Sequence, residues 1–172
     1  MKTMRLFVAY VACISVFVAC GPSQTKLIKD ITELETAIKE DLDTGKMSRL
    51  IGLYDTYVTN FTEDSLTEEY LFRAANVSRV LPNGELALKY YDLLIQKHPE
   101  SVYLPETYFF KAVVYEEIMY DMGAAAFYYK EFIKKFPSHP MVQDAQLSLK
   151  YLGKTPDEIV EMFKANEVSD TL

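Results

Sequence analysis

The sequence predicts an all-α fold built as a row of helical hairpins. One segment occurs twice, 38 residues apart and without a gap. Residues 70–74 (Tyr-Leu-Phe-Arg-Ala) resemble residues 108–112 (Tyr-Phe-Phe-Lys-Ala), and residues 95–99 resemble residues 133–137. Each copy consists of two amphipathic stretches and a closing proline, which is typical of stacked hairpin arrays. No stretch alternates apolar and polar residues over the length of a strand. We therefore expect helices only.

The first 19 residues have the pattern of an export signal. Lys2 and Arg5 precede an uncharged run over residues 6–19, which is shorter than the roughly 20 residues that a membrane-spanning helix needs. We exclude this segment from the fold. Residues 20–24 then form a short polar tether.

The end of this run resembles the lipobox of bacterial lipoproteins, in which the cysteine becomes the first mature residue and carries acyl chains such as palmitate. Val18 and Ala19 fit the positions before Cys20, and Phe17 departs from the family's usual aliphatic residue. Gly21 follows, where an aspartate would resemble an inner-membrane retention signal. The resemblance therefore implies lipidation of Cys20 and an outer-membrane destination. The alternative is an incidental cysteine at the end of a signal sequence.

Composition narrows the choice of partners. The chain has 18 basic and 25 acidic residues, a formal net charge of −7 and no basic cluster. Because lysine and arginine supply most of the affinity for phosphate backbones, we expect no nucleic-acid partner. Outside the signal segment Cys20 is the sole cysteine, so no disulfide can form within the mature chain.

The helices follow from apolar spacing and stop signals. A first, degenerate repeat covers residues 25–62, with helices near 25–43 and 47–61; its residues 54–61 resemble residues 91–98. The second repeat covers residues 67–99, with helices near 67–80 and 84–98. The third covers residues 105–137, with helices near 104–120 and 123–136. Together with two C-terminal helices, these repeats make one domain over residues 25–165.

The two C-terminal helices, over residues 140–152 and 156–165, are expected to cap that end of the array, and residues 166–172 to fray. Thr155, Pro156 and Glu158 together form a helix-start signal, because Thr155 can cap the free amides and Glu158 completes a capping box. The last helix offers four apolar side chains as a lid over the open end of the array: Ile159, Val160, Met162 and Phe163.

The repeats resemble the tetratricopeptide repeat (TPR). In the third repeat the matching residues are Tyr108, Ala112, Tyr115, Ala125, Tyr129 and Pro137; in the second they are Tyr70, Ala74, Val77, Ala87, Tyr91 and Pro99. The resemblance implies a right-handed solenoid of about three hairpins plus C-terminal capping helices. The 38-residue period exceeds the family's usual 34 residues. Together, the extended repeats and the lipobox are similar to envelope lipoproteins of the BamD and YbgF type and to small Bacteroidetes-type TPR lipoproteins.

Catalytic or metal-binding patterns are not recognisable. His98 and His139 each precede a proline at a helix end, where the helix dipole favours them. The paired carboxylates at 68–69 and 116–117 lie about 100° apart on their helices, which does not make an acid–base dyad. We expect no enzyme, no metal and no cofactor, and no small-molecule substrate is evident.

By resemblance, the first helix of each repeat lines a partner-binding groove. Its nominated residues are Leu71, Ala75, Ser78 and Arg79 in the second repeat and Phe109, Val113, Glu116 and Glu117 in the third. Leu71 and Phe109 are equally consistent with core positions. Arg79 with Glu116 and Glu117 could recognise charged groups of an extended peptide, or these three could pair with each other.

The expected function is that of a lipid-anchored, periplasm-facing scaffold of the bacterial outer membrane, which mediates protein–protein interactions between envelope proteins. By resemblance its process is outer-membrane protein assembly or the coordination of Tol-Pal with the cell wall. The alternative is a structural subunit that self-associates into an envelope lipoprotein complex. In both cases acylated Cys20 would hold the protein at the membrane.

Overall fold

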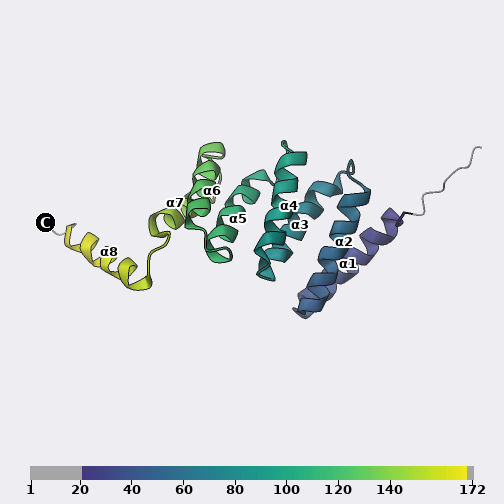
Figure 1. The fold of residues 1–172 in the computed structure, drawn as a ribbon, viewed down its shortest axis with the longest axis horizontal. Coiled ribbons are helices and arrows are strands. Elements are labelled where there is room, and N and C mark those ends of the chain that lie inside the picture. Colours follow the sequence, from purple (N-terminus) through teal and green to yellow (C-terminus); the bar gives the residue numbers. More distant parts are fainter. Residues whose placement is uncertain (1–20, 170–172) are drawn as a thin grey trace, which may run out of the picture.

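The computed structural model describes residues 21–169, and over these residues the chain is α-helical, without strands (Figure 1). The all-α prediction is confirmed. The predictions for the signal segment, Cys20 and the last three residues lie outside the described residues. The helices are α1 (Gln24–Glu40), α2 (Thr44–Asn60), α3 (Leu66–Val80), α4 (Gly84–Lys97), α5 (Leu104–Glu117), α6 (Met122–Lys135), α7 (Val142–Tyr151) and α8 (Pro156–Ser169).

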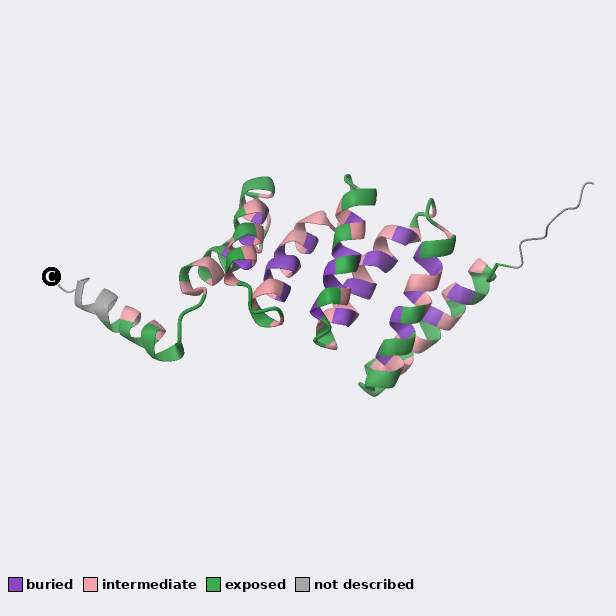
Figure 2. Cartoon of the chain, in the orientation of Figure 1, coloured by how far each residue is buried: buried purple, intermediate pink, exposed green. Residues whose placement is uncertain are grey.

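Helices α1 to α7 form a row in which each helix packs on the next one along the chain. The turns that join α1 to α2, α3 to α4 and α5 to α6 lie along one edge of the row in Figure 1, and the turns from α2 to α3 and from α4 to α5 lie along the other. Buried residues run along the inner faces of the helices, and exposed residues gather at the turns (Figure 2). The chain is therefore an elongated array of hairpins.

The second helix of each hairpin starts at the same kind of cap. Asp43, Asn83 and Asp121 each accept a hydrogen bond on a side-chain oxygen from the backbone N–H three residues later, at 2.7, 3.1 and 2.9 Å. Such caps satisfy amides that have no partner within the helix. Asp43 explains why α2 begins at Thr44 and not near residue 47 as predicted, and why α1 ends earlier than expected.

The turns between hairpins repeat one pattern of backbone hydrogen bonds. In the second hairpin the donors are the amides of His98, Ser101 and Leu104, and in the third they are the amides of the residues one 38-residue period later. In the first hairpin the equivalent donors stand 37 residues earlier, at Phe61 and Asp64. The predicted alignment of residues 54–61 with residues 91–98, which has this 37-residue offset, is confirmed.

A buried tyrosine on the second helix ties each hairpin together. Tyr54, Tyr91 and Tyr129 are at most 1% exposed. Each donates its hydroxyl to a polar side chain on the first helix of its own hairpin, where the acceptors are Glu35, Asn76 and Glu116. Burial raises the pKa of all three hydroxyls, so they stay protonated donors at neutral pH.

The four alanines that recur in the second and third repeats lie in the core. Ala74 and Ala112 on the first helices, and Ala87 and Ala125 on the second helices, are fully buried. A larger side chain at any of them would push two helices apart, because protein interiors are close-packed.

The C-terminal end differs from the prediction. The capping box is confirmed: the Thr155 amide donates to Glu158 Oε2 at 2.7 Å, and the Glu158 amide donates to Thr155 Oγ1 at 3.3 Å. The lid is wrong, because α8 extends away from α7 and Val160 remains 48% exposed (Figure 1). The helix also continues to Ser169, four residues past its predicted end, since no glycine or proline interrupts it.

Candidate binding cleft

Half of the nominated groove residues belong to the core. Ala75 and Ser78 are fully buried, Leu71 is 3% exposed and Phe109 is 8% exposed. Their nomination as a partner-contacting surface is wrong, and for Leu71 and Phe109 the core alternative is confirmed. They face neighbouring helices because hairpin stacking covers this side of α3 and α5.

The other four nominated residues do not form one site. Arg79 lies over the ring of Phe110 at 4.5 Å, and the described residues show no ion pair between Arg79 and either glutamate. Glu116 accepts a hydrogen bond from the Tyr129 hydroxyl at 2.7 Å, so it links α5 to α6 within the third hairpin. Val113 packs against the core around Tyr129 and Phe132, and Glu117 is exposed at the end of α5.

A cleft of about 520 Å³ opens instead between α1 and α3. Two of its walls are first helices of consecutive hairpins, and α2 and Tyr103 close its remaining sides. Apolar and polar side chains contribute in similar numbers. Its lining residues are Glu35, Ile38, Lys39, Leu50, Tyr54, Glu69, Phe72, Arg73, Asn76, Val77 and Tyr103.

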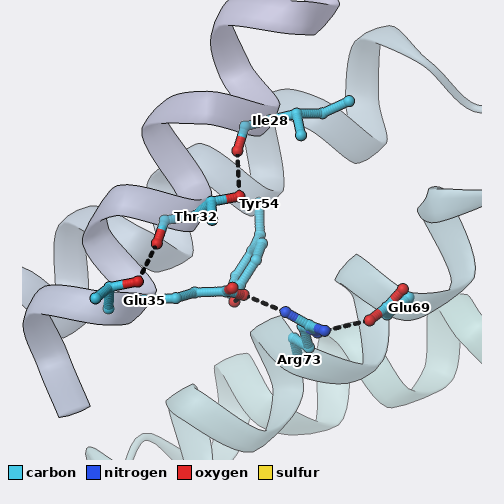
Figure 3. A network of polar contacts seen from close by, with 7 residues as sticks. Ile28, Thr32, Glu35, Tyr54, Glu69 and Arg73 are labelled. Atoms are coloured by element: carbon cyan, nitrogen blue, oxygen red, sulfur yellow. Dashed lines mark hydrogen bonds and ion pairs between the residues drawn. The ribbon is translucent and has the colours of Figure 1, made fainter.

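A chain of polar contacts crosses the cleft from α1 to α3. The guanidinium of Arg73 lies between two carboxylates, donating through one terminal nitrogen to Glu35 Oε1 on α1 and through the other to Glu69 Oε1 on its own helix (Figure 3). Tyr54 donates its hydroxyl to the same Glu35 oxygen. The second oxygen of each carboxylate receives no hydrogen bond within residues 21–169 and stays open to solvent.

Electrostatics keep Arg73 charged and Tyr54 protonated at neutral pH. Burial by itself would lower the pKa of Arg73, but the hydrogen bond and charge of Glu35, aided by Glu69, outweigh it and raise that pKa. Burial, and then the hydrogen bond to Glu35, raise the pKa of the Tyr54 hydroxyl. Arg73 is therefore a permanent cation between two glutamates, and Tyr54 a permanent donor.

Aromatic rings form the end wall of the cleft. The rings of Phe72 and Tyr103 stack with their centroids 5.0 Å apart and their planes 18° from parallel. Asn76 is fixed beside them, since it donates to the backbone oxygen of Phe72 at 3.1 Å and accepts the Tyr91 hydroxyl at 2.9 Å. The wall is therefore held by contacts with both α4 and the turn before α5.

A larger hollow of about 610 Å³ lies on the other side of α3, between α2 and α4. One of its polar groups, Asp64, holds the turn between the first two hairpins. Asp64 accepts from Tyr57 at 2.9 Å, from Gln24 at 2.7 Å and from the Leu66 amide at 2.9 Å, which occupies both of its oxygens. We favour the smaller cleft as the candidate binding site, because its charged groups converge from the first helices of two hairpins beside an apolar floor.

The equivalent place in the third hairpin is closed by an ion pair. Lys111 stands at the repeat position of Arg73, but it is 1% exposed and its ammonium bonds to Asp92 and to the Tyr128 hydroxyl. Burial would lower the pKa of Lys111, yet the bond to Asp92 prevails and raises it. The same repeat position therefore borders an open cleft at Arg73 on α3 and lies in an ion pair at Lys111 on α5.

Within the described residues, no group of three histidine, cysteine, aspartate or glutamate side chains is placed to hold a metal ion. None of the described helices has both the length and the apolar character to span a bilayer. No protein-family model matches the chain, and a search of curated proteins finds none with a matching sequence. Function is therefore inferred from the residues and the geometry of this chain.

Proposed function

We propose that this protein is a lipid-anchored, TPR-like scaffold of the bacterial cell envelope, which holds a segment of another envelope protein in the cleft between α1 and α3. The observation that carries the proposal is this cleft, in which three converging charged groups border an apolar floor on the first helices of two hairpins. Repeated hairpins commonly provide extended surfaces for binding polypeptides. The lipobox-like sequence around Cys20 supports the anchored location.

The fold suits this role because the cleft is held rigidly. Both walls are helices tied to their neighbours by buried tyrosine hydroxyls, and Arg73 links the two walls directly. A preorganised site loses less conformational entropy on binding than a flexible one. In the proposed solenoid the cleft is one section of a longer surface along the first helices.

In-cell crosslinking of a tagged, full-length protein, followed by mass spectrometry of the purified outer membrane, tests the proposal. We expect barrel-assembly components, or Tol-Pal and wall-synthesis proteins, to be recovered, and recovery to fall in a Cys20→Ser variant. A cleft variant, Glu69→Lys, should also lose the partner while a matched surface variant, Glu33→Lys, keeps it. Equal recovery by the two glutamate variants would contradict the cleft assignment.

A self-associating structural subunit is the second candidate. Leu147 on α7 is 52% exposed, although the residues one and two repeats earlier, Phe109 and Leu71, are buried. The C-terminal end of the array therefore presents an apolar side chain that a following helix covers in the other hairpins. Sedimentation of the chain from residue 21 distinguishes the candidates: self-association requires a dimer or larger species that Leu147→Lys dissociates, and a monomer at tens of micromolar excludes it.

A further inference from the structure

We infer that the partner segment presents an arginine or lysine side chain to the cleft, where it bonds to the free carboxylate oxygen of Glu35 or Glu69, with an apolar neighbour on the cleft floor. This inference rests on the proposed function and adds the chemistry of the partner. It depends on which hydrogen-bonding groups of the cleft are already used and which remain free.

The cation of the cleft already has its countercharges. Each terminal nitrogen of Arg73 donates to a glutamate, and the Tyr54 hydroxyl donates to Glu35. A partner carboxylate could reach only the remaining N–H groups of Arg73, beside two carboxylates that already neutralise it. It would also bring a third negative charge to a half-buried place, where like charges repel more strongly than in water.

The acceptors, in contrast, are available. Glu35 and Glu69 each keep one carboxylate oxygen without a hydrogen bond among the described residues, and their side chains are only 20% and 28% exposed. Two carboxylates around one guanidinium leave a local charge of −1. A second cation would complete the charge balance by bonding to one of these free oxygens.

The other charged residue of the lining does not change this preference. Lys39 is exposed at the rim of the cleft, one helical turn from Glu35, and forms no ion pair within residues 21–169. Exposed charges are well screened by water and salt, so Lys39 has less influence on a ligand than the half-buried glutamates.

Apolar side chains of the cleft indicate which residues should flank the cation in the partner segment. Ile38, Leu50 and Val77 line the floor, and the stacked rings of Phe72 and Tyr103 stand at its end. The flat guanidinium of an arginine can lie against such rings while it bonds to carboxylates, so arginine fits better than lysine. The expected motif is an arginine with a leucine-like neighbour.

Fluorescence anisotropy with the full-length protein in detergent tests the inference. The probe is a labelled hexapeptide, Gly-Leu-Arg-Leu-Ser-Gly, and its matched forms carry citrulline or glutamate in place of the arginine. We expect the arginine form to bind about tenfold more tightly than the neutral citrulline form, in line with one charge-assisted interaction. The glutamate form should bind most weakly.

Charge-neutralising variants locate the effect. Glu69→Gln and Glu35→Gln should each weaken arginine-peptide binding about threefold to tenfold. Glu33→Gln, on the exposed side of α1, should leave it unchanged. Equal binding of arginine and citrulline forms, tighter binding of the glutamate form, or no binding of the arginine form would overturn the inference.

The proposed function can survive such a failure, and a crosslink shows whether it does. A photo-crosslinking amino acid placed at Lys39 reports a partner in the cleft whatever its charge. A captured partner with no preference for the arginine peptide would overturn only the basic motif. No captured partner from Lys39 would contradict the cleft assignment itself.

Discussion

Glu35 and Arg73 are 38 residues apart, on the first helices of consecutive hairpins, and their side chains bond to each other across the cleft between α1 and α3. This contact joins two hairpins at the same place where a ligand would enter. It therefore gives Arg73 two roles that experiments can separate: holding the first hairpin to the second, and setting the charge of the cleft.

Removing the Arg73 side chain should weaken the array. We expect Arg73→Met to lower the free energy of unfolding by about 1–2 kcal/mol, because two glutamates lose a charged donor while water still reaches them in part. Urea unfolding followed by circular dichroism measures the change. Lys29→Met is the matched control, since it breaks only the exposed pair with Glu33 and should cost less than about 0.5 kcal/mol. Equal losses in the two variants would contradict the role of Arg73.

The ion pair in the third hairpin should respond unequally to loss of its two partners. Asp92→Asn leaves the ammonium of Lys111, which is 1% exposed, without its countercharge, and we expect a loss of about 2–3 kcal/mol. Lys111→Met removes the buried charge and keeps most of the volume, so stability should change by about 1 kcal/mol or less. The same unfolding measurement tests both. A larger loss for Lys111→Met than for Asp92→Asn would show that the pair itself stabilises the fold.

Because the backbone is strained at Tyr120, a substitution there should stabilise the fold. Its φ of 55° lies in the left-handed region, and its side chain is 77% exposed, so little packing compensates. We expect Tyr120→Asn to raise the free energy of unfolding by about 0.5–1 kcal/mol, because asparagine tolerates this conformation better. Val102→Asn, at a residue 78% exposed that does not have a positive φ, serves as the control and should give no gain.

Alkaline pH should destabilise the fold through its buried tyrosines. Burial raises the pKa of Tyr54, Tyr91 and Tyr129 above the ordinary tyrosine value of 10.0, so the unfolded chain loses these protons first. Their contribution is complete below about pH 10 and is lost as the pH rises further. The free energy of unfolding, measured by urea between about pH 9 and pH 11, should fall with a slope that Tyr54→Phe reduces. A slope that is the same in the variant would exclude Tyr54 as a contributor.

The all-α class and the helix boundaries could be predicted closely because their signals are local. Prolines, glycines and the Thr155 capping box set helix ends, and the structure places most boundaries within three residues of the predicted ones. Asp43 was missed as a cap because the first helix was expected to continue to residue 43. The course of α8 could not be predicted, since an amphipathic pattern shows that a helix has an apolar face but not which surface covers it.

The site was missed because the nominated residues lie on the wrong face of α3. Leu71, Ala75 and Ser78 form the stripe that neighbouring helices bury, whereas the cleft uses Glu69, Arg73 and Asn76. These two sets are separated by about half a turn, so an error of two positions exchanges surface for core. One signal was available: Glu35, Arg73 and Lys111 are charged residues at a regular 38-residue spacing. Which of them is open to solvent depends on packing between hairpins, and the sequence does not contain that information locally.

Site-specific photo-crosslinking in cells tests the central claim most directly. The full-length protein would carry the crosslinking amino acid at Lys39 in the cleft, at Lys97 in the larger hollow, or at the exposed Lys134 on α6, which belongs to neither. We predict one dominant adduct with an envelope protein from Lys39, lost when Glu69→Lys is added, and none from Lys134. An adduct from Lys97 alone, or equal yields from all three positions, would contradict the cleft as the binding site.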